Sequence, residues 1–325
     1  MMNANLNIQM LFRGVLVLLV AFSVGVAEAA KSSPKRRSTA KVKRVAKKPA
    51  AAAPQKRGPK CLGCISESPY RAALVFDETG RVYFEHRADE KVYPASTLKL
   101  MTLLVIQRKL ERREMTLDQL CEVSTLAASQ APSGVALKRG EKFPVRDLLY
   151  AIMIRSANDA AVCLAEAASG TVGAFVDEMN AEARRLGMND TLFQSPNGLP
   201  PRSRGKGGVH DRTTARDMMK LCLELCEHPA VFKYTSCARR TFGSGARAVN
   251  MVSHNPFLTG KRALAGCDGL KTGYTLAAGC SICLSVNRDG RRYMVLVMDS
   301  NSGDERNDSA QKLVDQYVPS FAESK

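Results

Sequence analysis

Pro94-Ala-Ser-Thr-Leu-Lys-Leu-Met-Thr102 is the stretch on which the interpretation of this sequence depends. We expect a helix from about Ser96 to Leu110, since large apolar residues recur there at helical spacing, at Leu98, Met101, Leu104 and Val105. Ser96 and Lys99 are three residues apart, so both side chains fall on one face of the first turn. The stretch therefore presents a hydroxyl and an amine together where a helix begins.

A serine hydroxyl is a poor nucleophile until a base takes its proton. A neutral lysine can be that base, and burial or a second cation nearby lowers its pKa. The free N–H groups of a helix start also favour a developing oxyanion. Ser-x-x-Lys alone is a weak signal, because Ser32, Ser38, Ser203 and Ser309 begin the same pattern. Only Ser96 opens a strongly apolar helix.

Two further short motifs lie downstream. Ser156-Ala-Asn158 follows a buried-looking run and precedes a helix of small residues, which fits a rigid turn that presents a hydroxyl and an amide. Lys271-Thr-Gly273 occurs once, in a strand-like run. On a strand Lys271 and Gly273 point to one face and Thr272 to the other. A glycine there allows a ligand backbone to approach closely.

The remaining pattern predicts strands at both ends of the folded region and helices between them. We expect strands at 71–77, 81–85, 270–275, 280–286 and 291–298, and helices at 145–150, 158–168, 172–186, 213–226 and 305–318. This order indicates an α+β fold in which an antiparallel sheet joins the N-terminal hairpin to the C-terminal strands.

In this order and context the three motifs resemble the penicillin-binding and serine β-lactamase superfamily. The closer resemblance is to the D-alanyl-D-alanine carboxypeptidases, the low-molecular-mass penicillin-binding proteins of serine peptidase family S11, and it spans Arg71 to Val318. Further shared segments are Gly140-Glu141, Val145-Arg-Asp-Leu-Leu149, Asn197-Gly-Leu199, His210 and Thr214-Ala-Arg-Asp217. The resemblance implies a β-lactamase/transpeptidase-like fold, in which an antiparallel sheet is flanked by a mainly helical subdomain.

The resemblance also implies the roles of the catalytic residues. Ser96 attacks the carbonyl between two D-alanines of a peptidoglycan pentapeptide stem and forms an acyl-enzyme. Lys99 accepts the proton of Ser96. Ser156 and Lys271 relay a proton to the departing D-alanine. Water then hydrolyses the acyl-enzyme, and β-lactams act as covalent inhibitors at the same serine.

The substrate-binding residues follow from the same resemblance. Lys271 and Thr272 hold the carboxylate of the terminal D-alanine, and Asn158 holds the substrate amide. The backbone N–H groups of Ser96 and Tyr274 form the oxyanion hole. His210 and Asp217 match the family pattern, although a purely structural role is the more economical interpretation for both.

The sequence also separates this activity from its alternatives. No cofactor is implied, and His86, His228 and His254 show no metal-ligand spacing, which argues against a zinc-dependent D,D-peptidase. The Glu-x-x-x-Asn stretch of class A β-lactamases is missing between the second and third motifs. A D,D-endopeptidase that cuts cross-links with the same residues stays open, as does a catalytically silent wall-binding scaffold.

Most of the excess charge lies before the folded region. The chain of 325 residues has a formal net charge of +17, which tempts an assignment to nucleic acid, yet twelve lysines and arginines and no acid lie in residues 31–60. Residues 1–29 are typical of a signal peptide, because Arg13 precedes an apolar run and Ala27-Glu-Ala29 offers a cleavage site. An uncleaved anchor is the alternative.

Residues 30–60 contain Lys, Arg, Ala, Pro and Ser and too few apolar residues to fold, so we expect a disordered basic linker before a catalytic domain at 61–325. An exported chain in the periplasm, or on the wall side of the cytoplasmic membrane, rarely meets nucleic acid. The linker could instead contact an anionic membrane or wall polymer. Many relatives carry a second domain and an anchor helix after the catalytic domain, which we do not expect here, and we expect the linker to replace the anchor by electrostatic attachment.

The ten cysteines could form disulfides, bind zinc or remain free thiols. They stand at positions 61, 64, 121, 163, 222, 226, 237, 267, 280 and 283. An even count in an exported chain is compatible with disulfides, but the sequence does not give their connectivity. Cys280 and Cys283 fall on one strand, too far apart to pair with each other. A zinc site joining Cys222 and Cys226 to Cys61 and Cys64 is a lesser alternative to small core residues.

Overall fold

A computed structural model of the chain describes residues 68–200 and 210–321. The predicted signal peptide at 1–29, the basic linker at 30–60 and the pair Cys61 and Cys64 lie outside these residues. In the described ranges no single helix is long and apolar enough to cross a membrane, and one pair of helices, bent by 86° at a short break, passes that test together.

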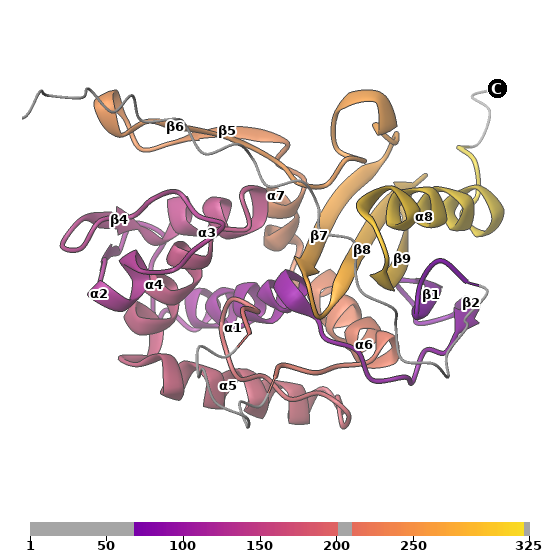
Figure 1. Cartoon of the computed structure of the whole chain (residues 1–325), viewed down its shortest axis with the longest axis horizontal. Helices are drawn as coiled ribbons and strands as arrows, with labels where there is room; N and C mark the ends of the chain where they lie inside the picture. Colours follow the sequence, from indigo (N-terminus) through magenta and orange to yellow (C-terminus); the bar gives the residue numbers. More distant parts are fainter. Residues whose placement is uncertain (1–67, 201–209, 322–325) are drawn as a thin grey trace, which may run out of the picture. The chain divides into compact units, whose positions relative to one another are not determined.

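A five-stranded antiparallel sheet forms one half of the domain (Figure 1). Its strands are β1 (Ala72–Asp77), β2 (Val82–His86), β7 (Cys267–Thr275), β8 (Gly279–Arg288) and β9 (Arg291–Ser300). Their order across the sheet is β2-β1-β9-β8-β7, so the N-terminal hairpin pairs with β9 and leaves β7 at the far edge. The predicted joining of the two ends of the chain in one sheet is confirmed.

Both faces of this sheet are covered, which explains why its inner strands are buried throughout rather than alternating. One face packs against α8 (Gly303–Tyr317), where Val295 and Val297 meet Leu313 and Val314. The opposite face continues into the large apolar core of the helical region through residues such as Leu296. Figure 1 shows α8 and the helical region on different sides of the sheet.

The second half consists of helices and two short hairpins. Its elements are η1 (Ala95–Leu98), α1 (Lys99–Glu111), β3 (Leu120–Glu122), α2 (Thr125–Ala128), β4 (Lys142–Pro144), α3 (Val145–Ile154), α4 (Asn158–Ser169), α5 (Val172–Arg185), α6 (Ala215–Cys226), η2 (Pro229–Val231), α7 (Phe232–Thr235), β5 (Arg239–Phe242), η3 (Gly245–Arg247), β6 (Val249–Val252) and η4 (Gly260–Arg262).

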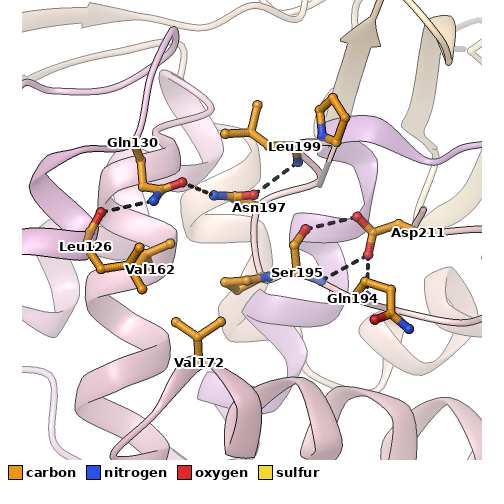
Figure 2. A pocket seen from close by; sticks show the side chains of 11 residues that line it. Leu126, Gln130, Val162, Val172, Gln194, Ser195, Asn197, Leu199 and Asp211 are labelled. Atoms are coloured by element: carbon orange, nitrogen blue, oxygen red, sulfur yellow. Dashed lines mark hydrogen bonds between the residues drawn. The ribbon is translucent and has the colours of Figure 1, made fainter. Parts of the chain in front are cut away.

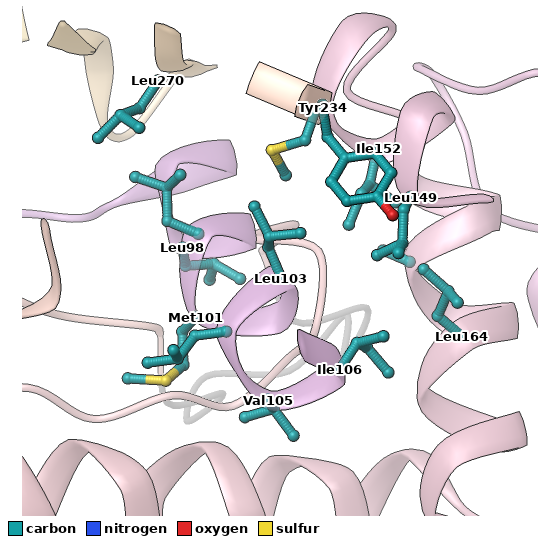
Figure 3. Packing of buried hydrophobic residues seen from close by; sticks show 14 of the residues in the cluster. Leu98, Met101, Leu103, Val105, Ile106, Leu149, Ile152, Leu164, Tyr234 and Leu270 are labelled. Atoms are coloured by element: carbon teal, nitrogen blue, oxygen red, sulfur yellow. The ribbon is translucent and has the colours of Figure 1, made fainter. Parts of the chain in front are cut away.

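Helix α1 is the centre of this half. Its residues from Lys99 to Gln107 are all buried, as expected of a helix that is surrounded by other elements. Figure 3 shows Leu103 and Ile106 of α1 pointing toward Ile152 of α3 and Leu164 of α4. Because α1 is held on every side, the residues of its first turn have fixed positions.

The structure corrects two details of the expected pattern. Ser96 lies in the 3₁₀ turn η1, and the α-helix proper begins at Lys99. The middle region contains two hairpins, β3–β4 and β5–β6, that the sequence did not indicate. Three of the four residues of β5 are exposed, and two of these, Arg239 and Arg240, are arginines, so this strand lacks the apolar alternation on which strand prediction rests.

Candidate active site

Ser96 and Lys99 meet at the junction of η1 and α1. Ala95, directly before the serine, has a positive φ of 48°, and the N–H of Thr97 donates to the carbonyl of Pro94 at 3.1 Å. This tight turn brings the Nζ of Lys99 to 2.9 Å from the Oγ of Ser96. The contact predicted from their spacing of three residues is therefore present.

The amine of Lys99 has three polar neighbours and no exposure to solvent. Besides Ser96, its Nζ lies 2.8 Å from Oδ1 of Asn158 and 2.6 Å from the carbonyl oxygen of Asn197. A neutral amine has two N–H groups and one lone pair. If Asn158 and Asn197 accept the two N–H groups, the lone pair is directed at the hydroxyl of Ser96.

Burial favours this neutral form. Desolvation, followed by the charge of Lys271, lowers the pKa of Lys99 well below its usual value, against the smaller opposing influence of Asp211 and Asp159. Desolvation also lowers the pKa of Lys271 to about 7. The first lysine is therefore suited to accept a proton near neutral pH, while the second remains substantially charged.

Ser156 and Asn158 lie in the turn between α3 and α4. Ser156 has a positive φ of 57° and only 5% of its surface is exposed. Such a conformation in a residue other than glycine is costly and persists where the surrounding structure imposes it. Asn158 begins α4, and its N–H donates to the carbonyl of Ser133 at 2.9 Å. The predicted rigid turn is confirmed, and it directs Asn158 toward Lys99.

Strand β7 forms the opposite wall. Lys271 is 2% exposed, and its Nζ donates to the carbonyl of Thr272 at 2.7 Å. A Cβ at Gly273 would lie 2.9 Å from the carbonyl oxygen of Pro94 and 3.1 Å from the N of Thr97. The backbone that approaches this glycine is therefore the turn that carries Ser96. Tyr274 is 58% exposed at the end of the same wall.

Asp211 holds the loop that supplies the carbonyl of Asn197. Its carboxylate accepts hydrogen bonds from the N–H groups of Gln194 and Ser195 and from the hydroxyl of Ser195. Desolvation raises the pKa of Asp211, and these hydrogen bonds oppose that rise. The sequence showed Asn197 only as part of a family pattern and missed Asp211, which comes from a segment sixteen residues away.

The loop also depends on Gly198, which has a φ of +79°. A Cβ at this position would lie 2.1 Å from the carbonyl oxygen of Ala95. The glycine therefore lets the Asn197 loop contact the turn before Ser96 directly, and no larger residue fits there.

A pocket of about 170 Å³ lies on this loop (Figure 2). Its apolar side chains include Leu126, Val162 and Val172. At its polar side, Nδ2 of Asn197 donates to Oε1 of Gln130 at 3.1 Å. The backbone carbonyl of the same asparagine accepts from Lys99, so the pocket and the surroundings of that amine share Asn197.

Arg306 on α8 is a charged neighbour that sequence reasoning missed. The residue is 9% exposed, and its charge contributes to the lowered pKa of Lys271. Its guanidinium donates to Oδ1 of Asn307. The sequence showed this helix only as an apolar stripe, and an arginine on its other face gave no signal.

The remaining predicted residues have structural contacts. Asp217 accepts hydrogen bonds from the N–H of Asp190 and the hydroxyl of Thr191, both at 2.9 Å. The ring of His210 packs against Tyr93 with centroids 5.0 Å apart. Asp217 therefore ties the start of α6 to a neighbouring loop, in line with the structural interpretation.

The zinc alternative concerns Cys222 and Cys226. Cys222 is fully buried, and its thiol is in hydrogen-bonding contact with that of Cys283. Within 68–200 and 210–321 no group of three or more His, Cys, Asp or Glu residues could hold a metal ion. Cys61 and Cys64, the other two ligands of that hypothesis, lie outside these ranges.

Curated relatives match about 70% or more of this chain. D-alanyl-D-alanine carboxypeptidase DacF of Bacillus subtilis is 30% identical over 245 residues, which is 75% of this chain and 60% of that protein. A D-alanyl-D-alanine endopeptidase of Pseudomonas aeruginosa is 29% identical over 236 residues, 69% of this chain and 70% of that protein. The chain thus spans about 60% of the length of the first of these relatives.

Solved structures and a family model agree with these relatives. D-alanyl-D-alanine carboxypeptidase DacD of Francisella tularensis superposes with a TM-score of 0.70 at 26% identity, over 83% of this chain and 73% of that one. Penicillin-binding protein D2 of Listeria monocytogenes, in its ampicillin-bound form, gives 0.66 at 29% identity, over 79% and 98%. The fold is thus β-lactamase/transpeptidase-like. The model of the S11 peptidases, described as D-alanyl-D-alanine carboxypeptidase, matches residues 67–302, more than half of the sequence. The chain therefore belongs to peptidase family S11, the family of the D-alanyl-D-alanine carboxypeptidases.

Proposed function

We propose that this protein is a serine D-alanyl-D-alanine carboxypeptidase that removes the terminal D-alanine from peptidoglycan pentapeptide stems. The observation that carries the proposal is the fully buried amine of Lys99, 2.9 Å from the hydroxyl of Ser96. A buried lysine without a carboxylate in hydrogen-bonding contact does not stabilise the folded state. Its lowered pKa instead suits a general base.

Acylation begins when the lone pair of Lys99 takes the proton of Ser96. The serine oxygen forms a bond to the carbonyl carbon of the penultimate D-alanine, and the carbonyl π electrons move to its oxygen. The N–H groups of Ser96, in η1, and of Tyr274, in β7, would stabilise that oxyanion. Collapse of the tetrahedral intermediate breaks the peptide bond and leaves the acyl group on Ser96.

The departing D-alanine needs a proton on its nitrogen. Ser156 and Lys271 supply it through a relay that returns the proton taken by Lys99. Lys271 and Thr272 bind the carboxylate of that residue, and the buried guanidinium of Arg306 adds positive potential. Asn158 holds the substrate amide. Water then attacks the acyl-enzyme, and Ser96 regains its proton.

A β-lactam would acylate the same serine. The Listeria monocytogenes relative was solved in an ampicillin-bound form. A fluorescent penicillin should therefore label this protein, and Ser96→Ala should abolish the labelling together with D-alanine release from a pentapeptide. Ser38→Ala is the matched control, because Ser38 begins another Ser-x-x-Lys and should be silent. A parent protein that takes up no label would favour the scaffold alternative and contradict the enzyme.

Endopeptidase activity is the second candidate. It is favoured by the Pseudomonas aeruginosa relative, which is named as an endopeptidase and matches over 70% of its length. The same nucleophile and base would cut a D,D cross-link between two stems. Parallel measurement of D-alanine release from pentapeptide and of scission of cross-linked muropeptides decides which activity predominates.

Export and attachment belong to the same proposal. Residues 1–29 would direct export, and the basic linker at 30–60 would hold the catalytic domain at 61–325 near an anionic membrane or wall polymer. Twelve positive charges without an acid support this role. Deletion of 31–60 should release the protein from the envelope fraction. A variant of equal length with those lysines and arginines replaced by glutamine should be released as well. Retention of either variant would contradict electrostatic attachment.

A further inference from the structure

The connection between β6 and β7 joins the helical half of the domain to the strand that carries Lys271. It leaves β6 beside α3, where the N–H of Ser253 donates to the carbonyl of Ala238 at 2.8 Å. It reaches β7 at Asn255, which is 3% exposed and donates to the carbonyl of Gly269 at 3.0 Å. Since both neighbours of His254 are fixed in this way, the imidazole has a defined place between α3 and β7.

Arg155 meets this imidazole from the other side. It directly precedes Ser156, and its carbonyl accepts a hydrogen bond from the hydroxyl of Ser133 at 2.9 Å. Its Nη1 lies 3.4 Å from Nε2 of His254. The two exposed side chains thus connect the turn of the second motif to the β6–β7 connection.

This contact lies beside the end of β7 that precedes Lys271, which is the leaving-group end of the proposed substrate cleft between η1 and β7. Gly269, to which the connection is pinned, stands two residues before Lys271, whereas Tyr274 of the oxyanion hole is at the opposite end of β7. An ordinary imidazole is already mostly neutral at pH 7, and partial desolvation, then the charges of Lys271 and Arg155, lower the pKa of His254 further. The imidazole is therefore neutral near pH 7, and its Nε2 can accept from the guanidinium of Arg155.

We propose that Arg155 and His254 close the leaving-group end of the cleft and select for a small terminal residue over a cross-linked one. This inference rests on the proposed function and specifies its leaving group. A terminal D-alanine ends in a methyl group and a carboxylate, and the guanidinium of Arg155 complements that carboxylate. The leaving residue of a cross-link carries a second stem peptide, which needs the space that the bridge occupies.

The test compares two substrates across matched variants. The quantity measured is kcat/KM for scission of a cross-linked muropeptide dimer divided by kcat/KM for D-alanine release from the pentapeptide. His254→Gly and Arg155→Ala should each raise this ratio by about tenfold, a discrimination of the size that one pocket contact supplies. The double variant should add little to either single change, because the two residues act as one bridge.

Two control variants test whether the change in ratio comes from loss of the contact between Arg155 and His254. His254→Gln keeps an acceptor for Arg155 and should hold the ratio near that of the parent. His228→Ala, which removes a histidine bonded to Glu111 at 2.8 Å, should leave the ratio unchanged. If His254→Gly and Arg155→Ala still react with penicillin but keep the parental ratio, the inference is overturned and the proposed function stands. A parent that releases no D-alanine overturns both.

Discussion

The basic side chains at the two ends of helix α1 have opposite surroundings. At its start, Lys99 is fully buried among neutral acceptors, and a second buried cation, Lys271, lowers its pKa further. Near its end, Arg108 pairs with Glu182 and Glu224, and Lys109 pairs with Glu178. The comparison separates a buried lysine whose pKa is lowered from cations that pair with carboxylates and join α1, α5 and α6.

The largest effect should come from exchanging one lysine at each end. Lys99→Met removes the base and should lower acylation by penicillin by about 10³-fold, the scale of general-base catalysis. Lys109→Met is the matched control on the same helix and should stay within a few-fold of the parent. Stopped-flow acylation rates measure both. Comparable losses in the two variants would show that the effect is structural and would remove the distinction between the two ends.

The pH dependence of activity should sharpen the comparison next. Below the lowered pKa of Lys99 the base is protonated, so acylation falls on the acid side. Above the pKa of Lys271, about 7, this lysine loses the charge that we propose binds the substrate carboxylate. The value of kcat/KM should therefore fall by up to about tenfold per pH unit on the alkaline side.

Lys271→Arg tests the assignment of the alkaline limb, because a guanidinium keeps its charge at every pH used. Whatever its absolute rate, this variant should lose the fall in kcat/KM that begins near the pKa of Lys271. If kcat/KM of the variant still falls at the same alkaline pH, that fall belongs to the titration of another group. Profiles of kcat/KM from pH 5 to 9 on the pentapeptide give the answer.

The stability of the second end of α1, where Arg108 pairs with Glu224, should change on the acid side of the pH scale. Desolvation would raise the pKa of Glu224, but hydrogen bonds from Arg185 and Arg108 lower it below the usual value. A carboxylate with a lowered pKa in the folded state stabilises the protein above its unfolded pKa, and that stability is lost as the pH falls through the folded value. Acid should therefore weaken this end of α1.

Glu224→Gln should cost about 1–2 kcal/mol of unfolding free energy at pH 7, less than a fully buried pair would, because part of the network is exposed to solvent. The difference from the parent should shrink below about pH 4, where the parental carboxylate is also protonated. Urea denaturation at both pH values measures it. A difference that is independent of pH would assign the loss to packing instead of charge.

The sequence indicated the first end of α1 and was silent about the second. Ser96 and Lys99 are three residues apart, so helical geometry alone brings them together. The partners of Lys99 come from far along the chain: Asn158 is 59 residues away and Asn197 is 98. Asn158 was expected from its motif and Lys271 from its own, but the contribution of Asn197 is a backbone carbonyl, which no side-chain pattern reveals.

Local pattern also explains what was correct and what was missed in the fold. The apolar runs of β1, β8 and β9 predicted a sheet, and the turn residues between β8 and β9 predicted their pairing. The β5–β6 hairpin is held on β4 and α3 instead by contacts between distant residues. The rings of Phe143 and Phe242 lie 4.8 Å apart, and Arg240 stacks over Tyr150. Tertiary contacts of this kind stabilise a strand whose own residues favour no strand.

The smallest effect should come from the pair between Lys109 and Glu178 at the second end of α1. Glu178 is 40% exposed, and its carboxylate lies 2.9 Å from Nζ of Lys109. Water and salt screen such a pair, so Glu178→Gln should change the unfolding free energy by less than about 0.5 kcal/mol, and 1 M salt should remove the difference. Ser169 keeps a partner, because its hydroxyl can donate to the amide oxygen as it does to the carboxylate at 2.7 Å. A loss as large as that of Glu224→Gln would mean that the whole cluster acts as one buried network, with Lys109 as much a part of it as Arg108.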